Sequence, residues 1–409
     1  MGMRYKKILL FLLIICITTI SGCWNKKELN ELSIISALGI DKNEEGEYVK
    51  TFQIINPKNV AGALQGGGGG QGPAVTVYSA TGKTILDSHY MGSTKISRRL
   101  YMAHTNLLVI SEELAREEGI IKILDAFERD PEIRPTTTIV IAHEAKAEDI
   151  VKSLTAIDNI PADKVVKTLE TSERVWGGEL KVTLQGVIKK LTDSGTDPLI
   201  TGVRVIGDPE KGKKIENIQA SELDATLEAD GLAIFKNGKL INWLHGDNAR
   251  GAVWVLDKLK KTIVNLEWEG VKDVIGYQVM RQNTEVSAAI KNEQPEITVH
   301  VRAEGDIREV RNPVKLSDPD VLRKIEKLAE KEIKRQIEGS VEFAKENKTD
   351  IFGFGDEVHR SYPDAWKDFG KDWQETVFPE IKVDVKVDAF IRRTGLRNNS
   401  YLSDYENSH

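Results

Sequence analysis

An uncharged apolar run of 13 residues, Ile8 to Ile20, follows Arg4, Lys6 and Lys7 at the start of the chain. As a helix it would span about 20 Å, well short of the ~30 Å hydrocarbon core of a bilayer. A short apolar core behind a basic start is typical of a secretory signal peptide. We therefore predict that residues 1–22 are a leader that directs export of a body folding outside the cytoplasm.

The leader ends at a candidate lipidation site. Small residues, Ser21 and Gly22, precede Cys23, whereas Cys16 follows the bulky Ile15. We expect cleavage between Gly22 and Cys23 and a diacylglycerol on Cys23, with or without a further acyl chain on its amino group, and no other cofactor. Two acyl chains would hold the protein to a membrane almost permanently. The alternative is ordinary secretion, with Cys23 as a free thiol.

The remaining 387 residues are enough for two or three domains. Hydrophobic residues make up 40% of the chain and charged residues 29%, as in a folded globular body. No later stretch is long and apolar enough to span a bilayer, and the mature chain has no second cysteine for a disulfide. The net charge of -6, with both signs intermixed, predicts no nucleic-acid binding and no polybasic patch for anionic lipid.

Hydrophobic periodicity predicts a mixed α/β (α+β) fold of three domains with no transmembrane span after cleavage. The predicted units are an N-terminal α/β domain, a middle mixed domain, a C-terminal domain with a long amphipathic helix and a terminal strand, and a flexible tail. They cover residues 23–195, 196–295, 296–395 and 396–409. Five consecutive glycines, 66–70, make residues 62–72 a flexible loop without a phosphate-binding signature.

Several elements have clear signals. Residues 83–100 and 111–128 are each predicted as one helix, and Asn237-Gly238 between apolar runs predicts a hairpin. Asp318-Pro319 should begin a long amphipathic helix, and the alternation over 381–388 predicts a strand with one buried face.

No catalytic constellation is apparent, so we expect no enzyme. The histidines are scattered without metal-ligand spacing, and no thiol remains once Cys23 is lipidated. The string His245-Gly246-Asp247-Asn248 is interpreted as a strand-to-helix loop in which Asp247 or Asn248 caps the helix. Asp197 lies among turn residues and is interpreted as a turn former.

One aromatic set, Phe352, Phe354, Trp366 and Trp373, has two interpretations. These residues follow the long helix, around the glycines of Asp350-Ile-Phe-Gly-Phe-Gly355. The simpler interpretation is a core closed by tryptophans over a glycine turn. The other is a surface for a partner protein, where Trp and Phe are concentrated.

Taken together, the motifs resemble the C-subunit lipoproteins of bacterial spore germinant receptors, the Ger(x)C family. The resemblance covers essentially the whole mature chain. It rests on Gly22-Cys23-Trp24, residues 28–32, 37–41, 98–104, 112–120, 129–134, 230–235, 350–355, 363–366, Trp373 and 383–391. The five glycines depart from the family pattern, so no role is assigned to the 62–72 loop.

The resemblance implies a non-enzymatic subunit required for nutrient germination, with three mixed α/β domains. It also implies a place on the outer leaflet of the spore inner membrane, beside the integral membrane A and B subunits, and action through protein contacts. Phe352, Phe354, Trp366 and Trp373 are the candidate contact residues. The alternative functions are an extracytoplasmic solute-binding lipoprotein of a transporter and, less supported, a cell-wall or lipid-acting enzyme.

Overall fold

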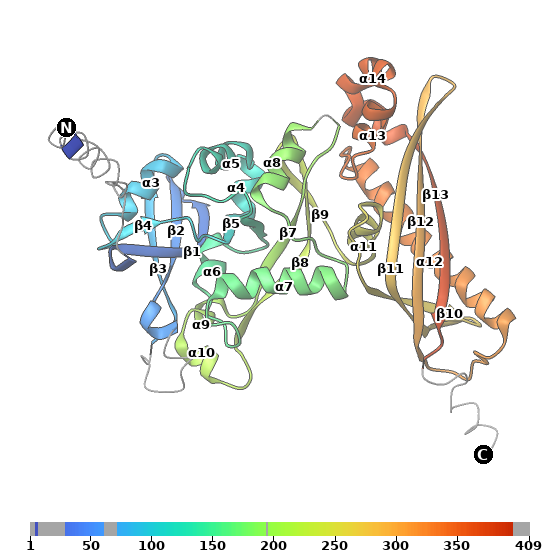
Figure 1. Cartoon of the computed structure of the whole chain (residues 1–409), viewed down its shortest axis with the longest axis horizontal. Coiled ribbons are helices and arrows are strands. Elements are labelled where there is room, and N and C mark those ends of the chain that lie inside the picture. Colours follow the sequence, from blue (N-terminus) through green and yellow to red (C-terminus); the bar gives the residue numbers. More distant parts are fainter. Residues whose placement is uncertain (1–4, 7–28, 61–71, 194, 396–409) are drawn as a thin grey trace.

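A computed structural model describes residues 5–6, 29–60, 72–193 and 195–395. The chain forms an elongated molecule with a large sheet unit at one end and a smaller one at the other (Figure 1). Within the described residues, no helix combines the length and the apolar character needed to cross a bilayer. The mixed α/β class predicted from the sequence is confirmed.

The first sheet has nine strands in the order β3-β2-β1-β5-β6-β7-β8-β9, with β4 paired to the start of β1. Its centre is parallel, because β1, β5, β6 and β7 run in one direction. Antiparallel hairpins extend it on both sides. The strands are β1 (Leu32–Lys42), β2 (Tyr48–Ile55), β3 (Val75–Gly82), β4 (Arg99–Tyr101), β5 (Leu107–Ser111), β6 (Thr138–Ala142), β7 (Leu199–Gly207), β8 (Ala225–Lys236) and β9 (Lys239–Leu244).

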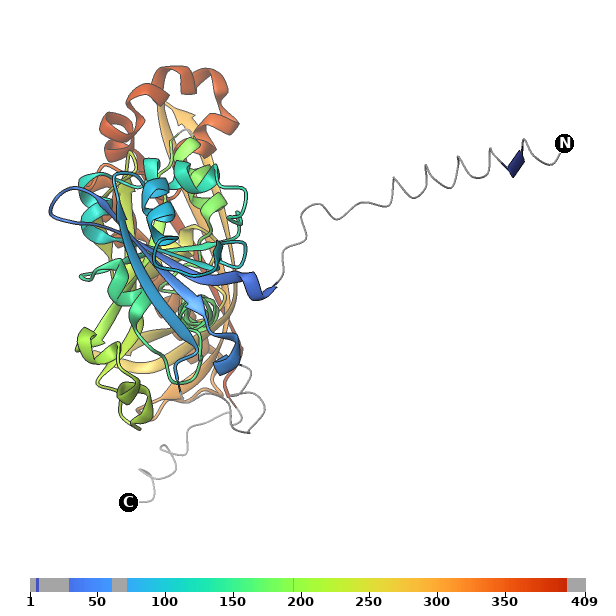
Figure 2. The same ribbon diagram turned by 90° about the vertical axis from the view of Figure 1, so that its left-hand side faces the viewer.

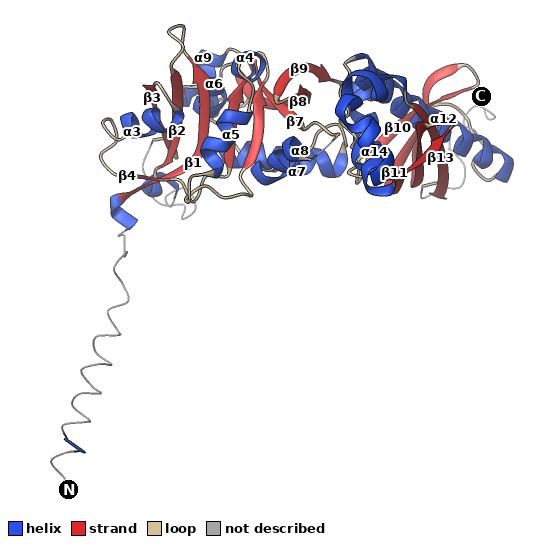
Figure 3. Ribbon diagram, turned by 90° about the horizontal axis from the view of Figure 1, so that it is seen from above, coloured by secondary structure: helices blue, strands red, loops and turns tan. Residues whose placement is uncertain are grey.

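Helices cover both faces of this sheet, as expected for parallel strands buried on both sides (Figure 3). One face packs against α3 (Ile85–Gly92), α4 (Glu112–Glu117), α5 (Ile121–Glu128) and α8 (Leu184–Thr192). The other packs against α6 (Ala147–Lys152) and α7 (Pro161–Val175). Shorter pieces are η1 (Leu29–Glu31), α9 (Pro209–Gly212) and α10 (Ile215–Gln219).

The second sheet has the order β10-β11-β12-β13 and carries the long helix α12 (Pro319–Glu346) on one face (Figure 1). Its strands are β10 (Thr262–Trp268), β11 (Val271–Lys291), β12 (Gln294–Val310) and β13 (Lys382–Arg393). The remaining helical elements are α11 (Gly246–Val255), α13 (Phe354–Ser361), α14 (Pro363–Phe369), η2 (Gly370–Asp372), η3 (Trp373–Val377) and α15 (Phe378–Glu380). One core cluster joins this unit to β7, β8 and β9 of the first sheet.

The two sheets divide the chain differently from the three predicted domains. Strands β7 to β9 complete the first sheet, and β10 and β11 pair into the second. Residues 196–295 therefore contribute strands to both sheets and form no sheet of their own. Strand pairing is a long-range property that local sequence patterns do not encode.

Two predicted helices are shorter than expected. In 83–100, α3 ends at Gly92 and Arg99 begins β4. In 111–128, the helix breaks at Gly119, whose φ of +86° interrupts α4 and α5. A Cβ at this position would lie 2.6 Å from the Gly238 carbonyl oxygen, which accepts a hydrogen bond from Ile120 N. The break thus serves contact with the β8–β9 hairpin.

Other local predictions are confirmed. Asn237 and Gly238 both have positive φ, as a two-residue hairpin turn requires. Asp318 caps α12 by accepting a hydrogen bond from Asp320 N, and the helix buries Ile325, Ala329, Ile333 and others along one stripe. The terminal strand runs beyond the predicted 381–388 to Arg393.

Candidate functional site

The carboxyl ends of the parallel strands bring together six polar and aromatic side chains. This edge is where open α/β sheets commonly bind their ligands. We call the group the edge cluster; it comprises Glu112 after β5, His143 after β6, Arg204 on β7, Asp230 on β8, Trp243 on β9 and His245 after β9.

Asp230 is at the centre of the edge cluster. Its Oδ2 lies 2.8 Å from His143 Nδ1 and 3.4 Å from Arg204 Nε, and its Oδ1 lies 3.6 Å from His245 Nδ1. The His143 ring stacks on Trp243 with centroids 3.9 Å apart and lies 5.5 Å from the His245 ring. The Asp230 carboxylate thus hydrogen-bonds the imidazole that stacks on Trp243, with the charged or polar groups of Arg204 and His245 close by.

Two glycines leave the space for this arrangement. A Cβ on Gly202 would lie 2.6 Å from the Trp243 ring, and one on Gly231 would lie 2.7 Å from His245 Nδ1. Gly231 also has a φ of +71°, which favours glycine. The pair Asp230-Gly231 inside a strand is the sequence signal that could have revealed the site.

Glu112 anchors the other side of Trp243. Its carboxylate accepts hydrogen bonds from Trp243 Nε1 at 3.0 Å, from Glu144 N at 2.9 Å and from Arg116 Nε at 2.8 Å. Burial opposes ionisation of Glu112, but these three donors hold its pKa below the ordinary value. The indole is therefore fixed by a charged acceptor at one edge and a stacked imidazole on its face.

The edge cluster is partly open to solvent. The side chain of His245 is 49% exposed and that of Arg204 39%, whereas His143 is buried. Across the described ranges, no group of three or more His, Cys, Asp or Glu is placed to hold a metal ion. An oriented set of donors and acceptors beside a fixed aromatic ring suits recognition of a polar group on a partner or small ligand.

A second polar centre lies inside the molecule, where the two sheet units meet. Asp350 is fully buried, and its carboxylate accepts hydrogen bonds from Phe352 N, Gly353 N and Gly355 N at 2.7–3.0 Å and from Trp373 Nε1 at 3.0 Å. Burial outweighs these bonds and raises its pKa to about 6. We call Asp350 and its neighbour Asp197 the junction hub.

Asp197 connects the junction hub to the first sheet. Its carboxylate accepts from Asn237 N at 3.2 Å, Thr349 Oγ1 at 3.1 Å and Gln374 Nε2 at 3.0 Å, and its own N–H donates to Asp350 O at 2.8 Å. Burial raises its pKa to about 6 as well. The interpretation of Asp197 as a simple turn former was therefore wrong, because it bridges both units.

The structure places all four candidate contact aromatics in the interior. Phe352 and Trp366 are each 8% exposed, Trp373 is 1% exposed and Phe354 is fully buried. Trp366 and Trp373 pack with ring centroids 5.3 Å apart, and a Cβ on Gly355 would lie 2.8 Å from Trp373 Nε1. In the chain on its own they close a core around the glycine turn and offer no exposed aromatic surface to a partner.

The string His245-Gly246-Asp247-Asn248 does join a strand to a helix, as predicted. The cap was wrong, however, because His245 occupies the N-cap position without a side-chain bond. Asp247 instead pairs with Arg335 of α12. Gly22, Cys23 and most of the 62–72 loop lie outside the described residues.

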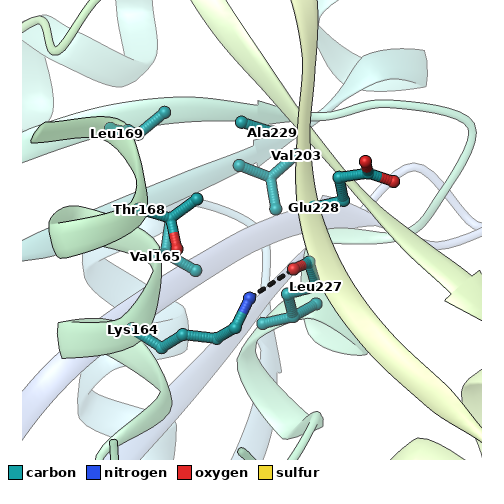
Figure 4. A pocket seen from close by; sticks show the side chains of 8 residues that line it. All are labelled: Lys164, Val165, Thr168, Leu169, Val203, Leu227, Glu228 and Ala229. Atoms are coloured by element: carbon teal, nitrogen blue, oxygen red, sulfur yellow. Dashed lines mark hydrogen bonds between the residues drawn. The ribbon is translucent and has the colours of Figure 1, made fainter. Parts of the chain in front are cut away.

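Two cavities bear on ligand binding. The one in Figure 4, between α7 and β8, has about 10 Å³, room for a single water at most, and Lys164 donates to Leu227 O beside it. A larger cavity of about 290 Å³ lies beside the junction hub, lined by Thr183, Lys190, Asp197, Leu256 and others. The second approaches the size of a small-molecule site, as does an open hollow of about 540 Å³ between α12 and β13.

Comparison with known proteins gives matches over the whole described body. The family model for the "Spore germination protein N-terminal domain" matches residues 25–205. The family model for "Spore germination B3/ GerAC like, C-terminal" matches residues 230–395. Spore germination protein KC of Bacillus subtilis (strain 168) is 47% identical over 395 residues, 96% of this chain and 97% of that protein.

More distant matches agree. Spore germination protein B3 of the same organism is 25% identical, covering 92% of this chain and 94% of that protein. The crystal structure of the GerBC protein superposes with a TM-score of 0.55 at 19% identity, covering 87% of this chain and 96% of that one, and thus shares its fold. The chain belongs to the spore germination B3/GerAC-like family.

Proposed function

We propose that this protein is a lipid-anchored subunit of a nutrient germinant receptor, required for spore germination. The observation that supports this most is the 47% identity to spore germination protein KC across 96% of the chain. In this proposal it acts on the outer leaflet of the spore inner membrane, through contacts with the integral membrane A and B subunits. Catalysis has no part in it.

The edge cluster is our candidate for such a contact. It is partly exposed, it presents Arg204 and His245 to solvent over the buried Trp243, and Arg is frequent at the energetic centres of interfaces. Confinement to the membrane raises the effective concentration of partner surfaces, so a modest contact area is enough.

The anchor in this proposal is the diacylglycerol on Cys23. Burial of two acyl chains contributes on the order of 20 kcal/mol at ~0.8 kcal/mol per methylene, which makes attachment effectively permanent. Metabolic labelling with a fatty-acid probe tests it directly: the wild type should be labelled and Cys23→Ala should not. An unlabelled wild-type protein would remove the anchor from the proposal.

A deletion strain tests the receptor role. Spores lacking the gene should lose the response to the nutrients this receptor serves and keep the response to calcium-dipicolinate, which serves as the control. A full response to every nutrient tested would contradict the proposal.

The cavity of about 290 Å³ gives the solute-binding alternative a specific location. A solute-binding protein should show saturable thermal stabilisation by its nutrient. Saturable stabilisation by a nutrient that is lost on Lys190→Ala, in the wall of this cavity, together with normal germination of the deletion strain, would favour this alternative.

A further inference from the structure

The face of α3 that points away from the sheet is unusually apolar. Leu86, Tyr90 and Met91 are 61%, 66% and 46% exposed, while Ile85, Ser88 and Gly92 face the core. Large exposed side chains of this kind, gathered on one helix, mark an interaction surface.

Basic residues flank this apolar face in the sequence. Residues 83–99 contain four basic side chains, Lys83, Lys95, Arg98 and Arg99, all exposed, and one acidic side chain, Asp87. Asp87 accepts a hydrogen bond from Lys83 N, and Arg99 pairs with Glu132 at 2.6 Å. Asp130 and Glu132, which lie near His89 of α3, are also acidic, so the local excess is one positive charge on a chain whose net charge is -6.

This surface lies at the end of the molecule where the described body begins. Figure 2 views that end of the molecule, which carries α3 and the start of β1. Arg99 pairs in register with Leu32, which directly follows η1. Only six peptide steps separate Cys23 from Leu29, so the chain can extend about 20 Å at most from one to the other.

We propose that the α3 surface, defined as Leu86, Tyr90, Met91 and the basic side chains of residues 83–99, rests on the anionic headgroup layer of the bilayer. This inference depends on the anchor at Cys23 proposed above. A tether this short holds the α3 end near the lipid, and the apolar side chains enter the boundary between headgroups and acyl chains. Lys83, Lys95 and Arg98 pair with lipid phosphates, whereas Arg99 keeps its pairing with Glu132. The net charge of the whole chain predicted no patch for anionic lipid, because a net charge does not show a local excess of basic side chains.

The test uses the full lipidated chain. The sequence has only Cys16 and Cys23, so a cysteine introduced by Met91→Cys is the only thiol of the folded body and can carry an environment-sensitive fluorophore. Val271→Cys, also on an exposed residue but on the second sheet, is the matched control. The probes are vesicles of phosphatidylcholine alone and of phosphatidylcholine with phosphatidylglycerol in equal parts, each with lipids spin-labelled near the headgroup.

We expect strong loss of fluorescence at position 91 in the anionic vesicles, less in phosphatidylcholine, and little at position 271. Arg98→Glu should reduce the loss at position 91, whereas the distant Lys272→Glu should not. Equal fluorescence loss at positions 91 and 271 would overturn the proposal. So would crosslinking experiments in native membranes in which position 91 reacts with a membrane protein and not with lipid. If the chain fails to float with any vesicles, the anchor fails; if it floats and position 91 stays unquenched, only the docking inference fails.

Discussion

The edge cluster and the junction hub are both built around an aspartate, yet they differ in what surrounds it. Asp350 is enclosed by the backbone N–H groups of its own turn and by Trp373. Asp230 is partly exposed and gathers side chains from separate strands. The comparison indicates that the hub holds the two sheet units together and that the cluster is free to meet a partner.

The largest expected effect is at the hub. Asp350→Ala leaves four buried donors without an acceptor, and we expect it to lower the free energy of unfolding by about 3–5 kcal/mol. Urea denaturation measures this. Asp364→Ala, at a side chain 97% exposed, should change stability by less than about 0.5 kcal/mol. A small effect at Asp350 would show that the hub does not hold the junction.

The hub should also respond to pH. The pKa of Asp197 is raised from 3.8 to about 6 by folding, so between these values the folded state holds a proton that the unfolded state has released. Its contribution to stability is therefore complete below about pH 4 and is lost as the pH rises through 6, by roughly 2–3 kcal/mol. Asp197→Asn should gain stability relative to wild type over that window, measured by urea denaturation at both ends. A stability difference between Asp197→Asn and wild type that is the same at both pH values would contradict the raised pKa of Asp197.

A substitution in the edge cluster should destabilise the protein less than Asp350→Ala does. Asp230→Asn removes the charge opposite His143 and Arg204 at a side chain that is 20% exposed, at a cost of about 1 kcal/mol. Asp388→Asn is the matched control, because Asp388 lies 2.8 Å from His300 Nε2 on the second sheet and is 53% exposed. We expect a smaller change there. A loss at Asp230 as large as at Asp350 would erase the distinction between the two sites.

The smallest expected effect on stability is at His245, which is 49% exposed. His245→Ala should change the free energy of unfolding by less than about 0.5 kcal/mol. In spores it should nevertheless slow nutrient germination at unchanged protein abundance, if the edge cluster meets a receptor partner. His300→Ala provides the comparison. Wild-type germination of His245→Ala spores would argue against the cluster as a contact site.

The sequence indicated the turn around Asp350, but it did not indicate the role of Asp197 or the edge cluster, for a physical reason. Three of the four hydrogen bonds to the Asp350 carboxylate come from backbone N–H groups of residues 352–355. The string Asp350-Ile-Phe-Gly-Phe-Gly355 therefore already indicated a tight turn under aromatic residues. His143 and Asp230 are 87 residues apart and meet only because β6, β7 and β8 are neighbours in the sheet. Strand order depends on long-range packing, which local periodicity does not report.

The same distinction explains the fold predictions. Local signals such as the Asn237-Gly238 turn and the Asp318 cap were confirmed, because they depend on neighbouring residues. The helix break at Gly119 was missed, because its cause is the approach of the Gly238 carbonyl from a distant hairpin. The aromatic set could be interpreted as core or surface until its burial was known.

The most direct test of the account is nutrient germination of spores in which Cys23→Ala replaces the wild-type residue, with calcium-dipicolinate as the control trigger. The account predicts that these spores lose the nutrient response, keep the calcium-dipicolinate response and lose the protein from the membrane fraction. A normal nutrient response from spores whose variant protein has left the membrane would contradict it.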